Sequence, residues 1–526
     1  MKNGSLTVGF VALLVAGGLA ASGYGAGSNE FQRAGNDSSP VQVGARPDGV
    51  APRQPRARVP VGIYAVVPVE NVVAKQQTEN PTDTTADLDT YLDGFYTDLL
   101  NNTAVSGLTL QIHWDTLNPN PPTDANPYFW NYVDDAFTSV AQWNFNNPNA
   151  TLNPKTIQLI VTPGFNSPNW VRDDLTSCDP LFYGSPVPSG FSCGEVTFTN
   201  FQEGGDSPVL PLPWNTTYQA AWKTFLQALA ARYDDNTAFV SIAVAGPTAA
   251  SAEMILPNGT TENQLQFVAD GGAAISPNAM WKALLQLQYP DNTTYWATDQ
   301  AFIDAWNAAI DMYGEVFSGV TLVATTGNGL PKFGSTAGPF PAPTTPIDFT
   351  PDCLYSENMD CQAETTILEH FVDPSVGGFN AKATQTSGLE STRPPGDLGE
   401  VGVRYLSQLT AGSTETSQIL GGAQFNGPFS TSTQAAENEG GSPNRQQALF
   451  NVLQDFFTGT SVAGEYCKPY AVAPAPLNYL QIYYQDIQYA ASHGATSVDE
   501  DCSTVMVSAQ DLLATASQQL LEIAEP

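Results

Sequence analysis

The stretch Phe239-Val-Ser-Ile-Ala-Val-Ala-Gly-Pro-Thr-Ala-Ala-Ser-Ala-Glu253 decides the fold class of this chain. It begins as a buried strand, breaks at a Gly-Pro pair, and runs through small residues to one carboxylate. This pattern is typical of a parallel barrel strand that delivers an acid to the barrel rim, where barrel enzymes carry their active sites. Similar runs recur along the chain and alternate with helical patterns, which extends the prediction to the whole chain.

Eight strand-like runs are predicted after residue 60, separated by helical patterns. They cover residues 62–68, 108–114, 156–162, 239–245, 320–325, 379–386, 418–424 and 477–484. Their near-continuous apolar sequences are typical of a parallel sheet that is covered on both faces. We therefore predict an α/β fold, a (β/α)8 TIM barrel with long loop insertions on its C-terminal rim. The alternative is an open doubly wound sheet, which would more often carry a Gly-rich phosphate loop after its first strand, and the sequence has none there.

The chain divides into three expected regions. Residues 1–26 read as a signal peptide, because Lys2 precedes an apolar run from Leu6 to Ala21 that ends in small residues. Residues 27–60 read as a disordered Pro/Arg linker, and residues 61–526 as the barrel domain. The apolar run is short and Gly-rich for a membrane span, so we expect a secreted or periplasmic protein that leaves the membrane once the signal is removed. An uncleaved N-terminal anchor is the alternative.

Composition excludes several classes of function. The formal net charge of the 526 residues is −34, from 18 Lys and Arg against 52 Asp and Glu. Only 13% of residues are charged, so the excess comes from scarce Lys and Arg and not from dense acidic runs. Nucleic acid is therefore not an expected partner, because phosphate contacts need a basic face. The sequence also lacks a His-Glu-x-x-His metal motif and a phosphate loop, and no cofactor is predicted.

The six cysteines indicate disulfides, as expected for an exported chain with an even number of them. Pairing neighbours gives 178–193, 353–361 and 467–502, which is one of 15 possible connectivities. A zinc site is the rival reading, but Cys-x-x-Cys spacing is absent and the chain has only 3 His. The predicted disulfide residues are Cys178, Cys193, Cys353, Cys361, Cys467 and Cys502.

Polar and aromatic side chains stand at the predicted C-terminal ends of the strands, the part of a barrel that carries the active site. Sugars present C–H faces that stack on aromatic rings and hydroxyls that need paired donors and acceptors, so these residues predict a carbohydrate partner. Any one of them could instead cap the core or tie down a loop. The candidate sugar-binding residues are His113, Trp114, Asp115, Asn166, Trp170, Asn328, Gln385, Gln424, Asn426, Tyr484 and Asp486.

Four segments resemble the barrel glycoside hydrolases that include β-galactosidases and endoglucanases. They are His113–Pro119, Val161–Trp170, the strand that ends at Glu253, and Tyr479–Asp486, and the likeness extends from about Val61 to the C-terminus. In that group an acid/base Glu ends the fourth strand and a nucleophile Glu ends the seventh. The resemblance therefore implies that Glu253 is the general acid/base of a hydrolase that cleaves poly- or oligosaccharide.

The chain departs from the family pattern at several positions. Ala252 stands where Asn usually precedes the acid, Gln424 ends the seventh strand in place of Glu, and Tyr484 replaces the expected Trp. An amide cannot attack a sugar carbon as a carboxylate does, so Glu390 and Glu437 are the candidates for the second carboxylate. Two further interpretations stay open: an inactive hydrolase-like barrel that binds glycan, and an exported structural protein without a pocket.

Overall fold

The computed structural model describes residues 58–148, 153–182, 186–198, 208–258, 267–268, 274–331, 333, 360–373, 381–389, 419–425, 427–428, 445–458, 460–462, 469–471, 477–500 and 503–524. The expected signal peptide at residues 1–26 lies outside these ranges, as do residues 27–57 of the expected linker. Arg58 is already fixed: it forms a parallel bridge with Val320, and its backbone N–H donates to the carbonyl oxygen of Gly319.

Eight parallel strands close into a barrel, in the ring order β1, β2, β3, β6, β10, β11, β12, β15 and back to β1. Their bounds are β1 (Gly62–Pro68), β2 (Val105–His113), β3 (Thr156–Thr162), β6 (Phe239–Ala243), β10 (Thr321–Gly329), β11 (Lys382–Leu389), β12 (Ile419–Phe425) and β15 (Leu477–Tyr483). Each overlaps one of the predicted strands, so the predicted (β/α)8 fold is confirmed. A further short strand, β7 (Glu253–Ile255), pairs with β10 beyond the end of β6.

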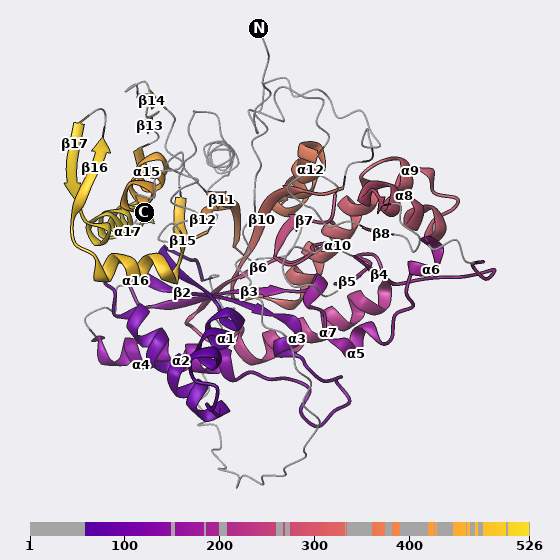
Figure 1. Cartoon of the computed structure of the whole chain (residues 1–526), viewed down its shortest axis with the longest axis horizontal. Coiled ribbons are helices and arrows are strands. Elements are labelled where there is room, and N and C mark those ends of the chain that lie inside the picture. Colours follow the sequence, from indigo (N-terminus) through magenta and orange to yellow (C-terminus); the bar gives the residue numbers. More distant parts are fainter. Residues whose placement is uncertain are drawn as a thin grey trace, which may run out of the picture.

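Helices surround the strands, with α1, α2 and α4 on one side of the barrel and α15 to α17 beside them (Figure 1). The longer helices are α1 (Val69–Glu79), α2 (Thr85–Leu100), α4 (Asn131–Asn146), α7 (Thr216–Tyr233), α8 (Pro277–Gln288), α10 (Gln300–Val316), α12 (Asp360–Val372), α15 (Arg445–Thr458), α16 (Tyr484–Ser492) and α17 (Ala509–Ala524). Local sequence sets where they begin. In α2, for example, Thr84 and Asp87 form a capping box and the buried residues Leu88, Leu92 and Leu99 recur at helical spacing.

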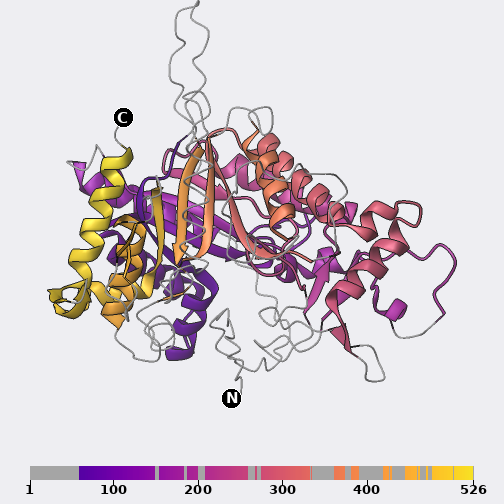
Figure 2. The same ribbon diagram turned by 90° about the horizontal axis from the view of Figure 1, so that it is seen from above.

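Shorter elements lie in the loops between the longer ones. They are α3 (Trp114–Leu117), η2 (Gly164–Asn166), α5 (Asn169–Arg172), α6 (Asp179–Phe182), α9 (Thr293–Ala297), β4 (Glu195–Thr197), β5 (Val209–Pro211), β8 (Phe267–Val268), β9 (Ala274–Ile275), β13 (Thr460–Val462), β14 (Pro469–Ala471), β16 (Thr496–Glu500) and β17 (Ser503–Val507). The last two strands, β16 and β17, form an antiparallel hairpin at the outer edge of the molecule, beside α15 and α17 (Figures 1 and 2).

Two large tyrosines fill the barrel interior, and glycines make the room for them. Tyr64 and Tyr479 meet edge to face with ring centroids 6.3 Å apart. A Cβ on Gly107 would lie 2.0 Å from the Thr156 carbonyl oxygen and 2.8 Å from the Tyr64 ring, and one on Gly422 would lie 2.1 Å from the Tyr479 ring. These glycines are therefore required for packing, since real Cβ atoms do not approach other atoms so closely.

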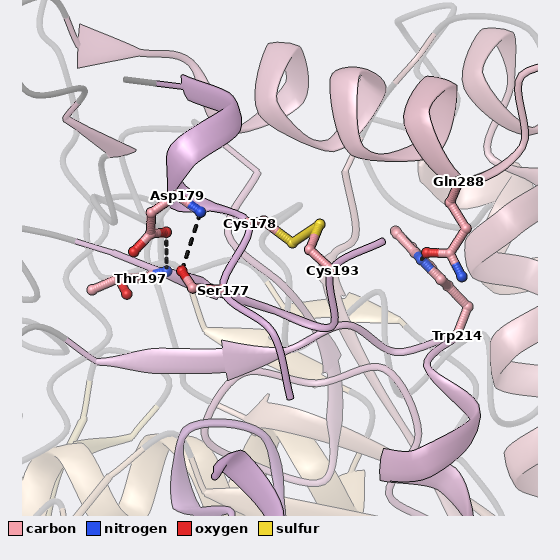
Figure 3. The surroundings of a disulfide bond; sticks show 7 residues. All are labelled: Ser177, Cys178, Asp179, Cys193, Thr197, Trp214 and Gln288. Atoms are coloured by element: carbon pink, nitrogen blue, oxygen red, sulfur yellow. Dashed lines mark hydrogen bonds between the residues drawn. A yellow bond between two sulfur atoms is a disulfide. The ribbon is translucent and has the colours of Figure 1, made fainter. Parts of the chain in front are cut away.

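Long insertions follow β3 and β6 on the C-terminal side of the barrel, as predicted for its rim. The insertion after β3 contains the disulfide Cys178–Cys193, which confirms the first predicted pair (Figure 3). Beside it, the Thr197 backbone N–H donates to Asp179 Oδ1 at 3.0 Å and the Asp179 N–H donates to Ser177 Oγ at 3.1 Å. The pairs predicted for Cys353, Cys361, Cys467 and Cys502 rest on side chains outside the described part of the chain.

Candidate functional site at the C-terminal end of the barrel

Glu253 lies on the inner face of the barrel. Its Cα pairs in register with Thr325 of β10, and Thr325 pairs with Gln385 of β11. Partners in a parallel register point to the same side of a sheet, and Thr325 and Gln385 are both buried in the interior. Glu253 itself is partly exposed at the open end. The sequence predicted Glu253 at the end of the fourth barrel strand, which is β6. The structure places it instead in the separate short strand β7.

Below Glu253, a network of amides crosses the barrel. The Tyr479 hydroxyl donates to Gln385 Oε1 at 2.8 Å, and Gln385 Nε2 donates to Gln424 Oε1 at 3.3 Å and to Gln481 Oε1 at 3.1 Å. Gln481 Nε2 in turn donates to Gln158 Oε1 at 2.8 Å. A buried polar group is tolerated only with such partners, so the network holds Gln385 and Gln424 in fixed orientations.

Tyr483, the last residue of β15, sits next to this network and was missed by the sequence prediction. Gln424 hydrogen-bonds to its side chain, and the carboxylates of Glu253 and Asp486 are close enough to act on it electrostatically. Burial raises the pKa of Tyr483, the charge of Glu253 raises it further, and the Gln424 hydrogen bond opposes the rise. Tyr483 therefore joins Glu253 and Gln424 at the mouth of the barrel.

The predicted sugar-binding role of Tyr484 is wrong, because the ring lies on the outer side of the barrel wall. It is 8% exposed and packs against Phe95 of α2 at a centroid distance of 5.1 Å. Side chains alternate along a strand, so Tyr479, Gln481 and Tyr483 share the inner face. That alternation was the signal in the sequence that pointed to Tyr483.

Trp114 is also wrongly assigned to the site. Its side chain is 0% exposed and packs on Trp222 at a centroid distance of 4.8 Å, in the core between the barrel and its helices. Trp170 lies edge to face with Trp114, and its indole N–H donates to the Asn118 carbonyl oxygen at 3.0 Å. Both tryptophans therefore hold the loop after β2 to the loop after β3, and Trp170 keeps a partly exposed edge.

A second polar group stands at the ends of β1 and β2. The His113 backbone N–H donates to Glu70 Oε1 at 2.9 Å, and His113 Nδ1 lies 4.0 Å from Asp115 Oδ1. The Asp115 side chain is 49% exposed. Partial burial raises the pKa of Asp115, His113 opposes the rise, Glu70 adds to it, and Arg172 opposes it more weakly. Glu70, which follows β1 directly, was not among the predicted site residues.

The remaining predicted residues fall into three groups. Asn166 donates from Nδ2 to Thr162 Oγ1 at 2.9 Å, which fixes the first turn after β3. Asp486 is 1% exposed, and its charge contributes to the raised pKa of Tyr483. The side chains that lie outside the described part of the chain are Asn328, Glu390, Asn426 and Glu437.

Within the described ranges, no three His, Cys, Asp or Glu side chains are grouped so that they could hold a metal ion. Over those ranges, too, every helix is too short or too polar to span a bilayer.

Comparisons with known proteins find only distant structural likenesses. No protein-family model matches the chain, and no curated protein matches it by sequence. Among solved structures, the chain is similar to the catalytic domain of β-amylase from Paenibacillus polymyxa, at 11% identity over 89% of this chain and 100% of that chain, with a TM-score of 0.39. It is also similar to the catalytic core of xylanase A, at 9% identity over 89% of this chain and 98% of that chain, with a TM-score of 0.37.

A third likeness is to β-galactosidase from the psychrophilic Marinomonas ef1, at 12% identity over 88% of this chain and 60% of that chain, with a TM-score of 0.31. Likenesses this distant carry no argument about activity, and the barrel itself is defined by the strand pairing. The fold expected from the faint resemblance to barrel glycoside hydrolases, a (β/α)8 barrel, is confirmed by the strand pairing itself.

Proposed function

We propose that the protein is a glycoside hydrolase that cleaves poly- or oligosaccharide, with Glu253 as its general acid/base. The observation that carries the proposal is the position of Glu253 on the inner face of the barrel's open end, beside Tyr483 and above the ordered amides. Parallel barrels carry their active sites at this end. The Glu253 carboxylate can transfer protons to and from a glycosidic oxygen, and the neighbouring glutamine amides and Tyr483 ring are neutral groups that can hydrogen-bond and contact sugar. This combination suits the cleavage of a neutral sugar chain.

Sugar recognition would use side chains from several strand ends. The groups available are the amides of Gln424 and Asn166, the imidazole of His113 and the partly exposed ring of Trp170, all on strands or loops at the C-terminal end of the barrel. Hydrolysis also needs a second group to act as nucleophile or base, and Glu390 and Glu437 remain the proposed candidates. Their distance from Glu253 decides the stereochemical outcome, since about 5 Å gives retention and about 6.5–9.5 Å gives inversion.

Turnover of a substrate panel tests this proposal. The purified protein is incubated with plant and microbial polysaccharides and with aryl glycosides, and released sugar is measured for wild type, Glu253→Gln and Glu369→Gln. Glu369 is an exposed carboxylate on α12 and serves as the matched control. We expect Glu253→Gln to lose roughly 10²–10⁴-fold in kcat and the control to lose nothing. Equal turnover of wild type and Glu253→Gln would remove Glu253 from the mechanism.

The alternative function is glycan binding without cleavage, and Gln424 favours it. This residue stands where the family resemblance implies a nucleophile, and its amide oxygen is already engaged by Gln385 Nε2 at 3.3 Å. In that case wild type binds immobilised glycans without turnover, and Gln424→Glu gains hydrolysis. Wild-type turnover that Glu253→Gln abolishes would exclude this alternative.

Export is proposed together with the hydrolase function. The N-terminal signal pattern supports it, and the disulfide Cys178–Cys193 is compatible with an oxidising compartment. Expression with the native N-terminus should place the protein outside the cytosol with its first residue near position 27, as N-terminal sequencing can determine. A cytosolic product that retains Met1 would contradict export.

A further inference from the structure

We propose that an ordered water molecule inside the barrel joins the side chains of Gln158 and Ser241 and so ties β6 to the amide network. The site lies in the barrel interior, and it holds whether or not the protein cleaves sugar. Because β6 leads directly into the 244–252 loop and Glu253, this water connects the strand before the candidate acid/base to the strands that carry the glutamines.

The Gln158 side chain has an orphaned NH₂ group at one end. The side chain is 1% exposed, and its oxygen accepts from Thr109 Oγ1 at 2.6 Å and from Gln481 Nε2 at 2.8 Å. Its Nε2 is buried and makes no hydrogen bond to any described residue. An NH₂ group left in this way has two unsatisfied donors, which costs free energy unless another group accepts from them.

Ser241 presents a second orphaned group on the neighbouring strand. Its Cα pairs in register with that of Gln158 across β6 and β3, so both side chains point into the barrel. Ser241 is also 1% exposed, and its Oγ has no hydrogen-bond partner within the described ranges. Its register partner on β10, Thr321, donates its hydroxyl to the Arg58 carbonyl oxygen at 2.7 Å and so does not serve Ser241.

The pairing of β3 with β6 is irregular at this point. Phe239 pairs with Ile157, and the next register pair is Ser241 with Gln158, so Val240 is an extra residue in β6. Such a bulge disrupts the ladder and bends the strand, which accounts for the missing direct bond between the two orphaned groups. An amide that donates and a hydroxyl that both donates and accepts are the partners that a buried water requires.

The water extends the amide network to the strand that precedes Glu253. From Gln158 the hydrogen bonds continue to Gln481 on β15, then to Gln385 on β11 and Gln424 on β12. Groups in such a network support one another, so a water that holds the Gln158 NH₂ group also stabilises the orientation of the amides beyond it.

A crystal structure that resolves bound waters tests the site directly. We expect a water peak at about 2.7–3.2 Å from both Gln158 Nε2 and Ser241 Oγ. The peak should weaken or disappear in Ser241→Ala and remain in Thr384→Val. Thr384 is the matched control, because it is buried on the other face of the sheet and its hydroxyl is also orphaned among the described residues. No peak, a direct bond between Gln158 and Ser241, or a peak unchanged in Ser241→Ala overturns the proposal.

Urea unfolding gives a second measurement, in solution and without substrate. We expect Ser241→Ala and Gln158→Met each to lower the free energy of unfolding, and the double variant to lose less than the sum, because the shared water is lost only once. Ser241→Ala combined with Thr384→Val should show additive losses, since these two side chains share no partner. Removal of a truly unsatisfied hydroxyl would leave stability unchanged or raise it. That result for Ser241→Ala, or additive losses for the first pair, overturns the proposal, whereas a failure to hydrolyse sugar refutes only the proposed function.

Discussion

Asp115 is a carboxyl at the barrel mouth whose environment favours the protonated form. Partial burial and Glu70 raise its pKa, against the opposing effect of His113. A general acid works only while protonated, so if Asp115 and not Glu253 supplies the proton, turnover should fall as pH rises through this elevated pKa. Asp115→Asn should lower kcat by roughly 10²-fold or more and abolish this alkaline limb in pH–rate measurements.

The control for this prediction is Asp291→Asn, at an exposed turn between α8 and α9. It removes one carboxyl far along the chain from the barrel mouth and should leave both kcat and the pH profile unchanged. An alkaline limb that persists in Asp115→Asn would exclude Asp115 as the proton donor.

Adjacent residues at the mouth show what the sequence could and could not predict about the site. The strand alternation from Tyr479 through Gln481 places Tyr483 inside and Tyr484 outside, but this depends on knowing that β15 ends at Tyr483. The prediction extended that strand by one residue, and a shift of one residue moves a side chain to the opposite face. Gln385 and Gln424 were placed on the inner face because each lies within its strand, away from the ends, and their role in sugar binding stays a prediction.

Trp114 was wrongly assigned for a related reason. Its position directly after β2 predicted a rim residue, but α3 begins at Trp114 and turns the ring into the core. The change of direction at a strand end depends on the tertiary contact with Trp222, which sequence order does not reveal.

At the scale of elements, the contact between α2 and α4 carries an excess of negative charge. Asp135 of α4 is partly buried, and Asp89, Asp93 and Asp134 lie around it, so burial and these charges raise its pKa to about 7. The folded state therefore binds the Asp135 proton more tightly than the unfolded chain does. The associated stability is present at low pH and is lost as pH rises from about 4 to about 7.

Asp135→Asn should consequently raise the Tm at pH 8 by a few degrees and change it little at pH 5. Thermal unfolding at both pH values measures this difference. Asp98→Asn removes an exposed charge from α2 and should leave the Tm the same at both. A lower Tm of Asp135→Asn at pH 8 would contradict the electrostatic account.

The turn after β3 is pressed against the loop that leads to Glu253. Gly164 has φ +72°, and a Cβ there would lie 2.1 Å from the Ala249 carbonyl oxygen. The Phe165 N–H also donates to that oxygen at 2.7 Å. Gly164→Ala should therefore destabilise the protein by about 1–3 kcal/mol or more, displace the 244–252 loop and lower activity.

Gly190→Ala separates the two causes of this loss. Gly190 has a similar φ of +78°, but a Cβ there would meet nothing within 4 Å. Gly190→Ala should therefore lose only the stability that the strained backbone conformation costs, as measured by denaturant unfolding. Its turnover should stay close to that of wild type. Equal losses in both variants would show that the contact with Ala249 is unimportant.

The elements were predictable to the extent that each one follows a local pattern. The eight strands were found because parallel strands buried on both faces read as continuous apolar runs. The strand β7 was missed because its three residues carry no pattern of their own, and it exists only by pairing with β10. Its pairing nevertheless determines where the Glu253 side chain points.

At the scale of the whole molecule, the Cys178–Cys193 disulfide closes a rim loop across a sequence separation of 15. In the chain-entropy account, a loop of this size restricts the unfolded state by about 3 kcal/mol. The double variant Cys178→Ala/Cys193→Ala should have a Tm lower by several degrees in differential scanning calorimetry. In the presence of reductant, the difference in Tm between the double variant and wild type should be smaller. An unchanged Tm of the double variant without reductant would contradict a stabilising role for the disulfide.

The pairing that closes the barrel joins the first strand to the last. Gly62 to Val66 of β1 pair with Tyr479 to Tyr483 of β15, so the ring is complete only when nearly the whole chain is present. On the ribosome, β1 and the strands beside it emerge long before their final partner does. The nascent chain must therefore carry an open sheet edge through most of its synthesis, and such edges invite pairing with other chains. We expect newly made protein to depend on chaperones that shield this edge until residue 483 has emerged.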